Sequence, residues 1–439
     1  MTTGFLDVAI VGAGQAGLAM SYFLKRGRCR HVVLERGRIG ETWRAQRWDS
    51  FALNTPNGVN GLPGAPYDGQ EPDGFWLRHE LVAFFERYAE KFALPIRTGV
   101  TVTSVERFSD GKGFRLELDT GTGIETLFAR SVVIASGGLQ APKIPAVSKQ
   151  LPREIVQLHT GDYRNPASLP PGAVVVVGGA QSGCQIAEDL IDGGRQVYLC
   201  TSKVGRRPRR YRGRDTALWH TDMGYFDVTV DELTDKSIIS APNSQHSGVG
   251  RHGHTVSLQQ LARDGVVVLG RLLGVEEGCL ILGDDAAENV RFADAKSEQL
   301  KRDIDAYIKR AGINPPPLED DPADVPDPNA DCALPVRRLD LKNANVTTVI
   351  WATGFAADFS WIRLPVLDQK GMPIYKRGVS TVPGLYFLGF QWLHTRKSGI
   401  IRGVGEDAGY LAGVIAEWLT PESAPALQVR PALNAQVVI

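Results

Sequence analysis

Near its N-terminus the chain reads Asp7-Val-Ala-Ile-Val-Gly12-Ala-Gly14-Gln15-Ala16-Gly17, a short apolar strand that runs into a glycine turn and the start of a helix. In such a turn the first glycine allows the tight bend, the second lets the backbone approach a pyrophosphate, and the third lets the helix pack on the strand. The helix N-terminus then faces the phosphates with unpaired N–H groups and the positive end of its dipole. This segment, which we term the first fingerprint, predicts a dinucleotide-binding unit.

An acidic residue at the end of the next apolar stretch supports this interpretation. Glu35 closes the stretch His31–Glu35, where a carboxylate accepts hydrogen bonds from a ribose 2′-hydroxyl. With the strand, helix and acid all in place, the first unit fits the ADP half of FAD.

A second, altered copy of the pattern begins at Ala173 after a proline-rich stretch. It contains Gly178-Gly-Ala180-Gln-Ser182-Gly183, the second fingerprint, with alanine at the middle glycine position. Thr201 stands where the first unit has Glu35, so that no carboxylate would repel a 2′-phosphate. Strands and helices alternate within each half, and we therefore predict an α/β fold with two Rossmann-like dinucleotide-binding domains.

A run of basic residues follows the second strand of this second unit. Its members are Lys203, Arg206, Arg207, Arg209, Arg210, Arg212 and Arg214. Arginine forks suit a phosphate dianion, so we expect some of them to bind the 2′-phosphate of NADPH. The alternatives are a solvated basic loop and a nucleic-acid patch. The whole chain has 49 basic and 49 acidic residues, and this neutral balance argues against a nucleic-acid partner.

The cysteines and the apolar segments narrow the class of protein further. None of the five cysteines has a CxxC-like neighbour, which argues against a zinc finger and against the cysteine pair of a disulfide reductase. Electrons from a flavin would then pass to oxygen, a quinone or another small acceptor. The first apolar stretch, Val8–Val11, is too short for a signal peptide or a membrane span, so we expect a soluble, cytoplasmic protein without a membrane partner.

The order and spacing of further motifs resemble those of the flavin-containing and YUCCA-type monooxygenases, in particular their bacterial flavoprotein relatives. Beside the two fingerprints, the markers are Gly40-Glu-Thr42-Trp43, Leu53-Asn54-Thr55-Pro56, Leu158-His159-Thr-Gly-Asp-Tyr163, Ala352-Thr-Gly354-Phe355, and Gly384-Leu-Tyr-Phe-Leu-Gly389 followed by Gly399 and Gly403. They span nearly the whole chain. Two departures are Ala180 in the second fingerprint, and Arg153 and Ile155 at the Phe and Gly places of the family's FxGxxxHxxx(Y/F) stretch.

The resemblance implies that an NADPH domain is inserted into an FAD domain. Residues 1–165 and 340–420 would form the FAD domain, residues 166–339 the NADPH domain, and residues 421–439 a C-terminal tail. The active site would lie in the cleft between the two domains.

The resemblance also implies a reaction. NADPH would reduce FAD, the reduced flavin and oxygen would form a C4a-(hydro)peroxyflavin, and one oxygen atom would pass to a soft N or S nucleophile or to a carbonyl of a small organic substrate. The alternative is an NADPH-dependent reductase or oxidase that passes electrons to a quinone or releases peroxide. No segment supports a flavin-bound redox sensor, and the sequence carries no signal for the substrate or for the oligomeric state.

The motifs yield a set of expected cofactor-binding residues. They are Gly12, Gly14, Gln15, Ala16, Gly17, Glu35, Arg36, Thr42, Trp43, Ser136, Gly178, Ala180, Ser182, Gly183, Ser202, Lys203, Arg206, Arg207, Gly354, Gly389 and Gly399. Asn54 is the candidate catalytic residue, because an amide near the flavin could donate a hydrogen bond to its oxygen adduct. The alternative role is that of a turn asparagine before Pro56.

Three groups of residues have weaker functional interpretations. His246, His252 and His254 are better explained as a mobile loop over the active site than as a metal site, since no cysteine or carboxylate pair accompanies them. The aromatic residues Tyr211, Trp219, Tyr225 and Phe226 line a substrate pocket or belong to the core. His394, with Trp392 and Arg396, is expected near the flavin edge as a packing contact rather than as a base.

Overall fold

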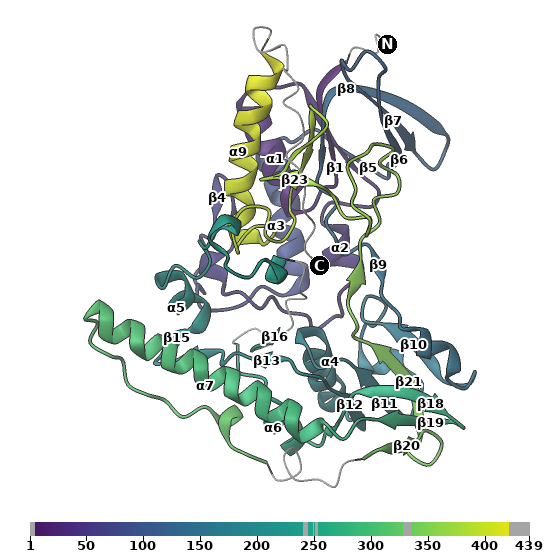
Figure 1. The fold of residues 1–439 in the computed structure, drawn as a ribbon, viewed down its shortest axis with the longest axis vertical. Helices are drawn as coiled ribbons and strands as arrows, with labels where there is room; N and C mark the ends of the chain where they lie inside the picture. Colours follow the sequence, from purple (N-terminus) through teal and green to yellow (C-terminus); the bar gives the residue numbers. More distant parts are fainter. Residues whose placement is uncertain (1–4, 240–244, 249, 251–252, 328–335, 421–439) are drawn as a thin grey trace.

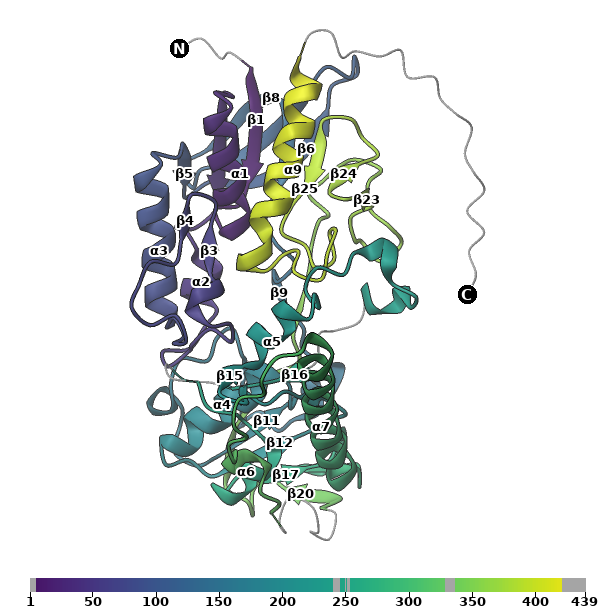
Figure 2. The same cartoon turned by 90° about the vertical axis from the view of Figure 1, so that its left-hand side faces the viewer.

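The computed structural model describes residues 5–239, 245–248, 250, 253–327 and 336–420. It shows an elongated molecule of two α/β lobes, one above the other (Figures 1 and 2). The expected C-terminal tail, residues 421–439, and His252 lie outside the described residues.

The first lobe is built on a sheet whose central strands are parallel. β1 pairs with β2 on one side and with β8 on the other, so that Ile10 lies between Val33 and Val133. Val8, Ala9 and Ile10 are fully buried, as expected for a parallel strand covered on both faces. The sheet order is β23 (Tyr375–Lys376), β24 (Val379–Ser380), β25 (Leu385–Phe387), β8 (Ile124–Ile134), β1 (Leu6–Val11), β2 (His31–Glu35) and β5 (Ile96–Thr98), with β6 (Thr101–Arg107) and β7 (Phe114–Asp119) attached to β8 as an antiparallel meander.

Three helices cover this sheet. α1 (Gln15–Arg26) packs against α9 (Ile401–Leu419) and α3 (Arg78–Lys91), and the three stand side by side in both views (Figures 1 and 2). The short α2 (Glu41–Ala45) lies where this lobe meets the second one.

The second lobe repeats the design with a smaller sheet. Its five strands, all parallel, are β10 (Val156–His159), β21 (Val346–Trp351), β11 (Ala173–Val177), β12 (Val197–Cys200) and β17 (Val267–Leu269). Its main helices are α4 (Gln181–Asp192), α5 (Thr216–Asp222), α6 (Leu258–Arg263) and α7 (Ala286–Ala311). An antiparallel sheet of β18 (Leu272–Glu276), β19 (Cys279–Leu282) and β20 (Arg338–Asp340) adjoins it.

Short elements complete the two lobes. They are β3 (Gly61–Leu62), β4 (Ala65–Pro66), β9 (Ala141–Pro142), β13 (Gly205–Arg206), β14 (Arg210–Tyr211), β15 (Arg214–Asp215), β16 (Gln245–His246), β22 (Phe355–Ala356), and the 3-10 turns η1 (Asn57–Val59), η2 (Ala146–Gln150), η3 (Pro166–Ser168), η4 (Val230–Glu232), η5 (Lys236–Ile239) and η6 (Pro322–Asp324).

The strand pairing places the limits of the second lobe at other residues than the expected boundaries, 165 and 340. β10 and β21 were both expected in the first domain, but β21 lies between β10 and β11 in the second sheet. An apolar strand such as Val346–Trp351 suits either parallel sheet, so its pattern does not reveal its partner. The two lobes are instead joined where β9 pairs with β22, Phe355 lying opposite Pro142.

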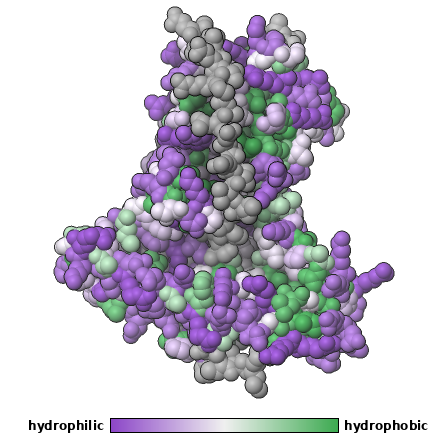
Figure 3. Space-filling model, in the orientation of Figure 1, coloured by the Kyte–Doolittle hydropathy of each residue, from purple (hydrophilic) through white to green (hydrophobic). Residues whose placement is uncertain are grey.

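The surface of the molecule is mixed. The face shown in Figure 3 is mostly hydrophilic, and hydrophobic residues gather at the end of the second lobe near β10 and β18, where Val156 and Leu273 are exposed. Among the helices of the described residues, none combines the length and the apolar character needed to cross a bilayer.

Candidate active site

The first fingerprint forms an open cradle at the start of α1. Gly12 has a φ of 109°, and a Cβ there would lie 2.6 Å from the carbonyl oxygen of Ala135, while a Cβ on Gly17 would overlap the Gly12 carbonyl. At Gly14 the situation is reversed, because the position of a Cβ has open space around it in the described structure. Gly14 is also the N-cap of α1, and no side chain caps the helix. Unpaired N–H groups beside open space fit a dinucleotide pyrophosphate.

Glu35 closes the cradle from the end of β2. Its buried carboxylate accepts hydrogen bonds from the backbone N–H of Ala13 at 2.8 Å and of Gly37 at 2.9 Å. Each carboxylate oxygen has a second lone pair, so the group can fix the loop and still accept a ribose hydroxyl.

Gln15 connects the cradle to two distant segments. Its side-chain oxygen accepts a hydrogen bond from Trp43 Nε1 at 3.1 Å, and its Nε2 donates to the carbonyl of Gly399 at 2.8 Å. Gly399 precedes α9, whose N-terminus has no side-chain cap either. The structure therefore brings together three residues, far apart in the sequence, that were expected at one cofactor.

The remaining residues expected around the first fingerprint lie nearby, with one exception. The backbone of Ser136 approaches Gly12, Gly389 packs against Ala16, Thr42 lies in α2 next to Trp43, and Arg36 is exposed directly after Glu35. The exception is Gly354, whose carbonyl pairs with His159 Nε2 at 2.8 Å at the junction of the lobes.

The second fingerprint has almost the same turn. Gly178 has a φ of 119° and a Cβ there would lie 2.6 Å from the Ala352 carbonyl, while a Cβ on Gly183 would overlap the Gly178 carbonyl. Ala180 is the uncapped N-cap of α4, and Ser182 follows it as the second residue of that helix. The open space found at Gly14 explains why an alanine is tolerated at the equivalent position.

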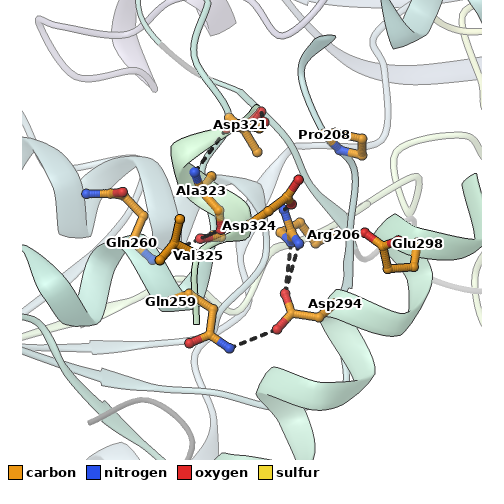
Figure 4. A network of polar contacts seen from close by, with 12 residues as sticks. Arg206, Pro208, Gln259, Gln260, Asp294, Glu298, Asp321, Ala323, Asp324 and Val325 are labelled. Atoms are coloured by element: carbon orange, nitrogen blue, oxygen red, sulfur yellow. Dashed lines mark hydrogen bonds and ion pairs between the residues drawn. The ribbon is translucent and has the colours of Figure 1, made fainter. Parts of the chain in front are cut away.

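Arg206 has a different place from the one expected (Figure 4). Its side chain is 2% exposed and pairs with Asp294 of α7 at 3.0 Å and with Asp324 of η6 at 2.8 Å. Asp294 also accepts a hydrogen bond from Gln259, and Asp324 one from Lys301. Arg206 thus fastens α7 and the acidic connector to the body of the lobe. Its commitment to two carboxylates argues against the expected contact with a 2′-phosphate.

The other basic residues of the run also have partners within the protein, most of them in the second lobe. These pairs are Lys203–Glu288, Arg207–His220, Arg209–Asp215, Arg212–Asp305 and Arg214–Asp222, while Arg210 donates to the carbonyl of Asp73. Three of the acids that pair with this run, Glu288, Asp294 and Asp305, lie on α7. Lys203 and its partner Glu288 are both about half exposed. Lys203 is therefore the basic residue best able to exchange its partner for a ligand.

Asn54 lies at the seam between the lobes. It is exposed, and its backbone carbonyl accepts a hydrogen bond from Arg209 Nη1 at 2.9 Å. The buried Arg209 guanidinium also pairs with Asp215 at 2.6 Å and lies 4.9 Å from the centre of the Phe75 ring. Arg209 thus ties the Asn54 loop to the second lobe instead of remaining free for a phosphate.

A second connection across the seam is a stack of rings and guanidinium groups. Arg396 lies between Trp392 at 4.6 Å and Tyr225 at 4.1 Å, and Tyr225 stacks on His220 at 4.0 Å. Arg207 Nη2 lies 2.8 Å from His220 Nδ1. Burial, together with the charges of the two arginines, lowers the pKa of His220 to about 3, so this imidazole is neutral. Of the four aromatic residues expected in a pocket or the core, Tyr225 joins the lobes.

The chain also pairs with itself through backbone hydrogen bonds at the seam. Val230 N donates to the carbonyl of His394 at 2.9 Å, and Lys397 N donates to that of Phe226 at 3.2 Å. The second lobe is thereby fastened to the turn that precedes α9.

The described histidines of the histidine-rich loop contact the second fingerprint and its helix. Buried His246 places Nδ1 3.2 Å from the Gly179 carbonyl, and burial lowers its pKa to about 4. His254 Nε2 pairs with Glu188 of α4 at 2.6 Å, and this contact raises the His254 pKa. The described residues hold no cluster of three His, Cys, Asp or Glu side chains arranged as metal ligands.

Comparisons with known proteins agree with this two-cradle geometry. Residues 9–216 match the family model described as pyridine nucleotide-disulphide oxidoreductase. An uncharacterized CzcO-like oxidoreductase of Geobacillus kaustophilus is 32% identical over 411 residues, covering 92% of this chain and 97% of that protein. The indole-3-pyruvate monooxygenase YUCCA1 of Oryza sativa subsp. japonica is 27% identical over 325 residues, covering 69% of this chain and 79% of its own length.

Solved structures share the fold. A flavin-containing monooxygenase from Stenotrophomonas maltophilia superposes with a TM-score of 0.57 at 21% identity, covering 94% of this chain and 99% of that one. The OTEMO protein in complex with FAD and NADP gives a TM-score of 0.53 at 14% identity, covering 94% of this chain and 85% of its own.

Proposed function

This chain belongs to the oxidoreductase family that includes the CzcO-type proteins and the flavin-containing and YUCCA-type monooxygenases, and from this membership we propose that it is an FAD- and NADPH-dependent monooxygenase. The balanced reaction is substrate, O2, NADPH and H⁺ giving oxygenated substrate, H2O and NADP⁺. The proposed substrate is a small organic molecule that offers a soft N or S nucleophile or a carbonyl.

The observation that carries the proposal is the pair of open glycine cradles, one in each lobe, at the starts of α1 and α4. Two dinucleotides bound in one chain allow a hydride to pass from a nicotinamide to a flavin. The state of the cysteines argues against disulfide chemistry. Those of the described residues are unpaired, and burial raises the pKa of Cys29 to about 11 and that of Cys200 to about 12, so neither is a thiolate at neutral pH.

In the first lobe we propose that the chain holds FAD through three groups. The N–H groups at the start of α1 bind the pyrophosphate, Glu35 accepts the ribose hydroxyl, and the Gln15 bridge keeps the N-terminus of α9 at the flavin ring. The positive end of α9 favours negative charge on the ring. When bound and reduced, the flavin supplies the activation of oxygen.

In the second lobe we propose that NADPH binds at the second fingerprint. Because Arg206 is held by two acids, we assign the 2′-phosphate to Ser202 and Lys203, which lie two and three residues after the end of β12. Arg207 lies at the seam beside His220, so we assign it to lobe contact and not to this phosphate.

Asn54 is the proposed catalytic residue. Its exposed side chain lies on a loop whose backbone Arg209 holds against the second lobe, so that the amide can donate a hydrogen bond in the cleft without a large ordering cost.

Product analysis tests the proposal. The purified protein should carry about one FAD per chain, and oxidation of NADPH under ¹⁸O2 with a thioether such as thioanisole should place one ¹⁸O atom in the sulfoxide. Release of all the oxygen as hydrogen peroxide, or equal turnover with a quinone in the absence of oxygen, would assign the chain to the reductase and oxidase class instead.

A further inference from the structure

A cavity of about 660 Å³ opens between the first half of α9 and the β3–β4 hairpin. Its walls are more apolar than polar, with Phe23, Val59, Leu62, Tyr67, Ile401 and Tyr410 among them. The polar side chains on the walls are those of Asn60, Arg402 and Glu406. The volume and the apolar lining are those of a site for a small organic molecule.

The cavity adjoins the proposed catalytic loop. Asn60, which lines it, exchanges two hydrogen bonds with Thr55, at 2.9 Å between the side chains and at 3.1 Å to the backbone carbonyl. Thr55 is the neighbour of Asn54. On the opposite wall, Arg402 lies three residues after Gly399, which accepts the Gln15 hydrogen bond. One end of the cavity therefore lies at the start of α9, and Asn60 connects its other wall to the residue that follows Asn54.

Arg402 is the cation of this apolar wall. Its Nη1 donates to Thr221 Oγ1 at 3.0 Å and its guanidinium lies 4.4 Å from the centre of the Phe226 ring. In the described part of the chain, no carboxylate lies within ion-pairing distance of it. The nearest acids, Asp227 and Glu406, both pair with Lys397 at 2.6 Å. Arg402 thus keeps donor groups of a planar fork that none of the described acids occupies.

A partly buried guanidinium beside an apolar wall favours one kind of ligand. Removing the cation from water costs free energy unless an anion pairs with it, and burial lowers the pKa of Arg402 accordingly. A carboxylate accepts two parallel N–H groups of the arginine fork, whereas a neutral ester or amide accepts them more weakly. The aromatic and aliphatic walls suit an apolar body on the same molecule.

We propose that this cavity is the substrate-binding site and that Arg402 selects substrates in which an apolar body carries a carboxylate. The role of the cavity as a substrate site rests on the proposed monooxygenase function. The binding site and its preference for a carboxylate do not depend on turnover.

The test uses two probes, 4-(methylsulfanyl)benzoate and its methyl ester, which differ in charge and by one methyl group. Binding to the purified holoprotein is measured by calorimetry without NADPH. We expect the wild type to prefer the carboxylate, and Arg402→Met to lose roughly 10- to 100-fold in carboxylate affinity because charge-assisted hydrogen bonds disappear, with little change for the ester. Arg402→Lys keeps the charge but not the fork and should fall between the two.

Two control variants separate selection from structure. Thr221→Val removes the hydrogen bond that Arg402 makes to the second lobe and should leave both affinities unchanged. Arg153→Met removes an exposed arginine of the second lobe and should do the same. Equal carboxylate affinity in wild type and Arg402→Met would overturn the role of Arg402.

A pair of glycines on α9 tests the cavity itself. Gly409 lines it, and a Cβ there would lie 3.2 Å from Phe23, whereas Gly413, one turn later, has open space and does not line the cavity. Gly409→Leu should weaken both probes and Gly413→Leu neither. Unchanged binding in Gly409→Leu would place the site elsewhere.

Turnover distinguishes this inference from the proposed function. If the probes bind as expected but no sulfoxide forms, the site stands and the monooxygenase proposal fails. If sulfoxide forms from both probes with the same KM in wild type and Arg402→Met, the monooxygenase stands and the inference about Arg402 fails.

Discussion

The first and second fingerprints share a turn but differ at the end of the following strand. Their leading glycines have φ values of 109° and 119°, and both helices begin without a side-chain cap. After β2, the Glu35 carboxylate turns back onto its own loop. After β12, the Thr201 hydroxyl turns away and donates to the Leu269 carbonyl at 2.7 Å. We therefore expect the turn to set where a pyrophosphate can bind, and the residue at the strand end to set whether the adenosine ribose may carry a 2′-phosphate.

The largest expected effect breaks one cradle and spares the other. Gly14→Val should give folded but colourless protein, because its side chain enters open space that the pyrophosphate needs. Ala180→Val should stay yellow and lose reduction by NADPH instead. Flavin absorbance and far-UV circular dichroism of the two variants check this, and full FAD content in Gly14→Val would refute the assignment of the first cradle.

The next effect concerns the ion pairs that Arg206 forms with Asp294 and Asp324 in the second lobe. Arg206→Met leaves Asp294 and Asp324 without their buried partner and should lower the free energy of unfolding by about 3 kcal/mol. Arg214→Met, which breaks a pair that is more than one-third exposed on both sides, should cost less than about 1 kcal/mol. Urea denaturation measures both. If the folded Arg206→Met protein has a higher KM for NADPH but an unchanged KM for NADH, then Arg206 does contact the 2′-phosphate.

A smaller effect tests the proposed contact between Lys203, which follows β12, and the 2′-phosphate. Lys203→Ala should raise the KM for NADPH about tenfold, through the loss of one charge-assisted contact, and leave that for NADH nearly unchanged. Flavin-reduction kinetics with both donors give the result. Arg210→Ala, at an exposed residue of the same run, is the matched control.

The smallest effect has the opposite sign. Glu288→Gln frees Lys203 from its exposed ion pair and should lower the KM for NADPH by roughly two- to threefold, in line with the modest strength of such pairs. The gain should vanish in the double variant with Lys203→Ala. A gain that persists there would locate the phosphate contact on another residue.

Sequence reasoning worked where the determinants are local. Gly12, Gly17 and Glu35 lie within one strand–turn–helix–strand unit, and the pattern of that unit predicted the cradle that the structure contains. The α/β class followed from the repetition of the unit.

Contacts between residues that lie far apart in the sequence were not predicted. The arginine run predicted a phosphate site. However, Asp294 of α7, which pairs with Arg206, lies 88 residues further along the chain. The pairing of β21 with β11 and the contact between Arg396 and Tyr225 likewise join segments more than 150 residues apart. Nothing in the local pattern of either segment specifies such a partner.

The junction of β9 with β22 has a consequence for modularity. The chain enters and leaves the second lobe at strands that pair with each other, Phe355 opposite Pro142. On the first-lobe side of that junction, β25 pairs directly with β8, Leu385 opposite Val132. The first sheet is therefore continuous without the second lobe. Segments whose two ends lie close together can be inserted or exchanged without distorting their host. The second lobe is thus one continuous segment between β9 and β22, and we expect that its replacement by the equivalent lobe of a relative, with the contacts of Arg209, Arg396 and Arg402 kept, would change the electron donor and leave the first sheet intact.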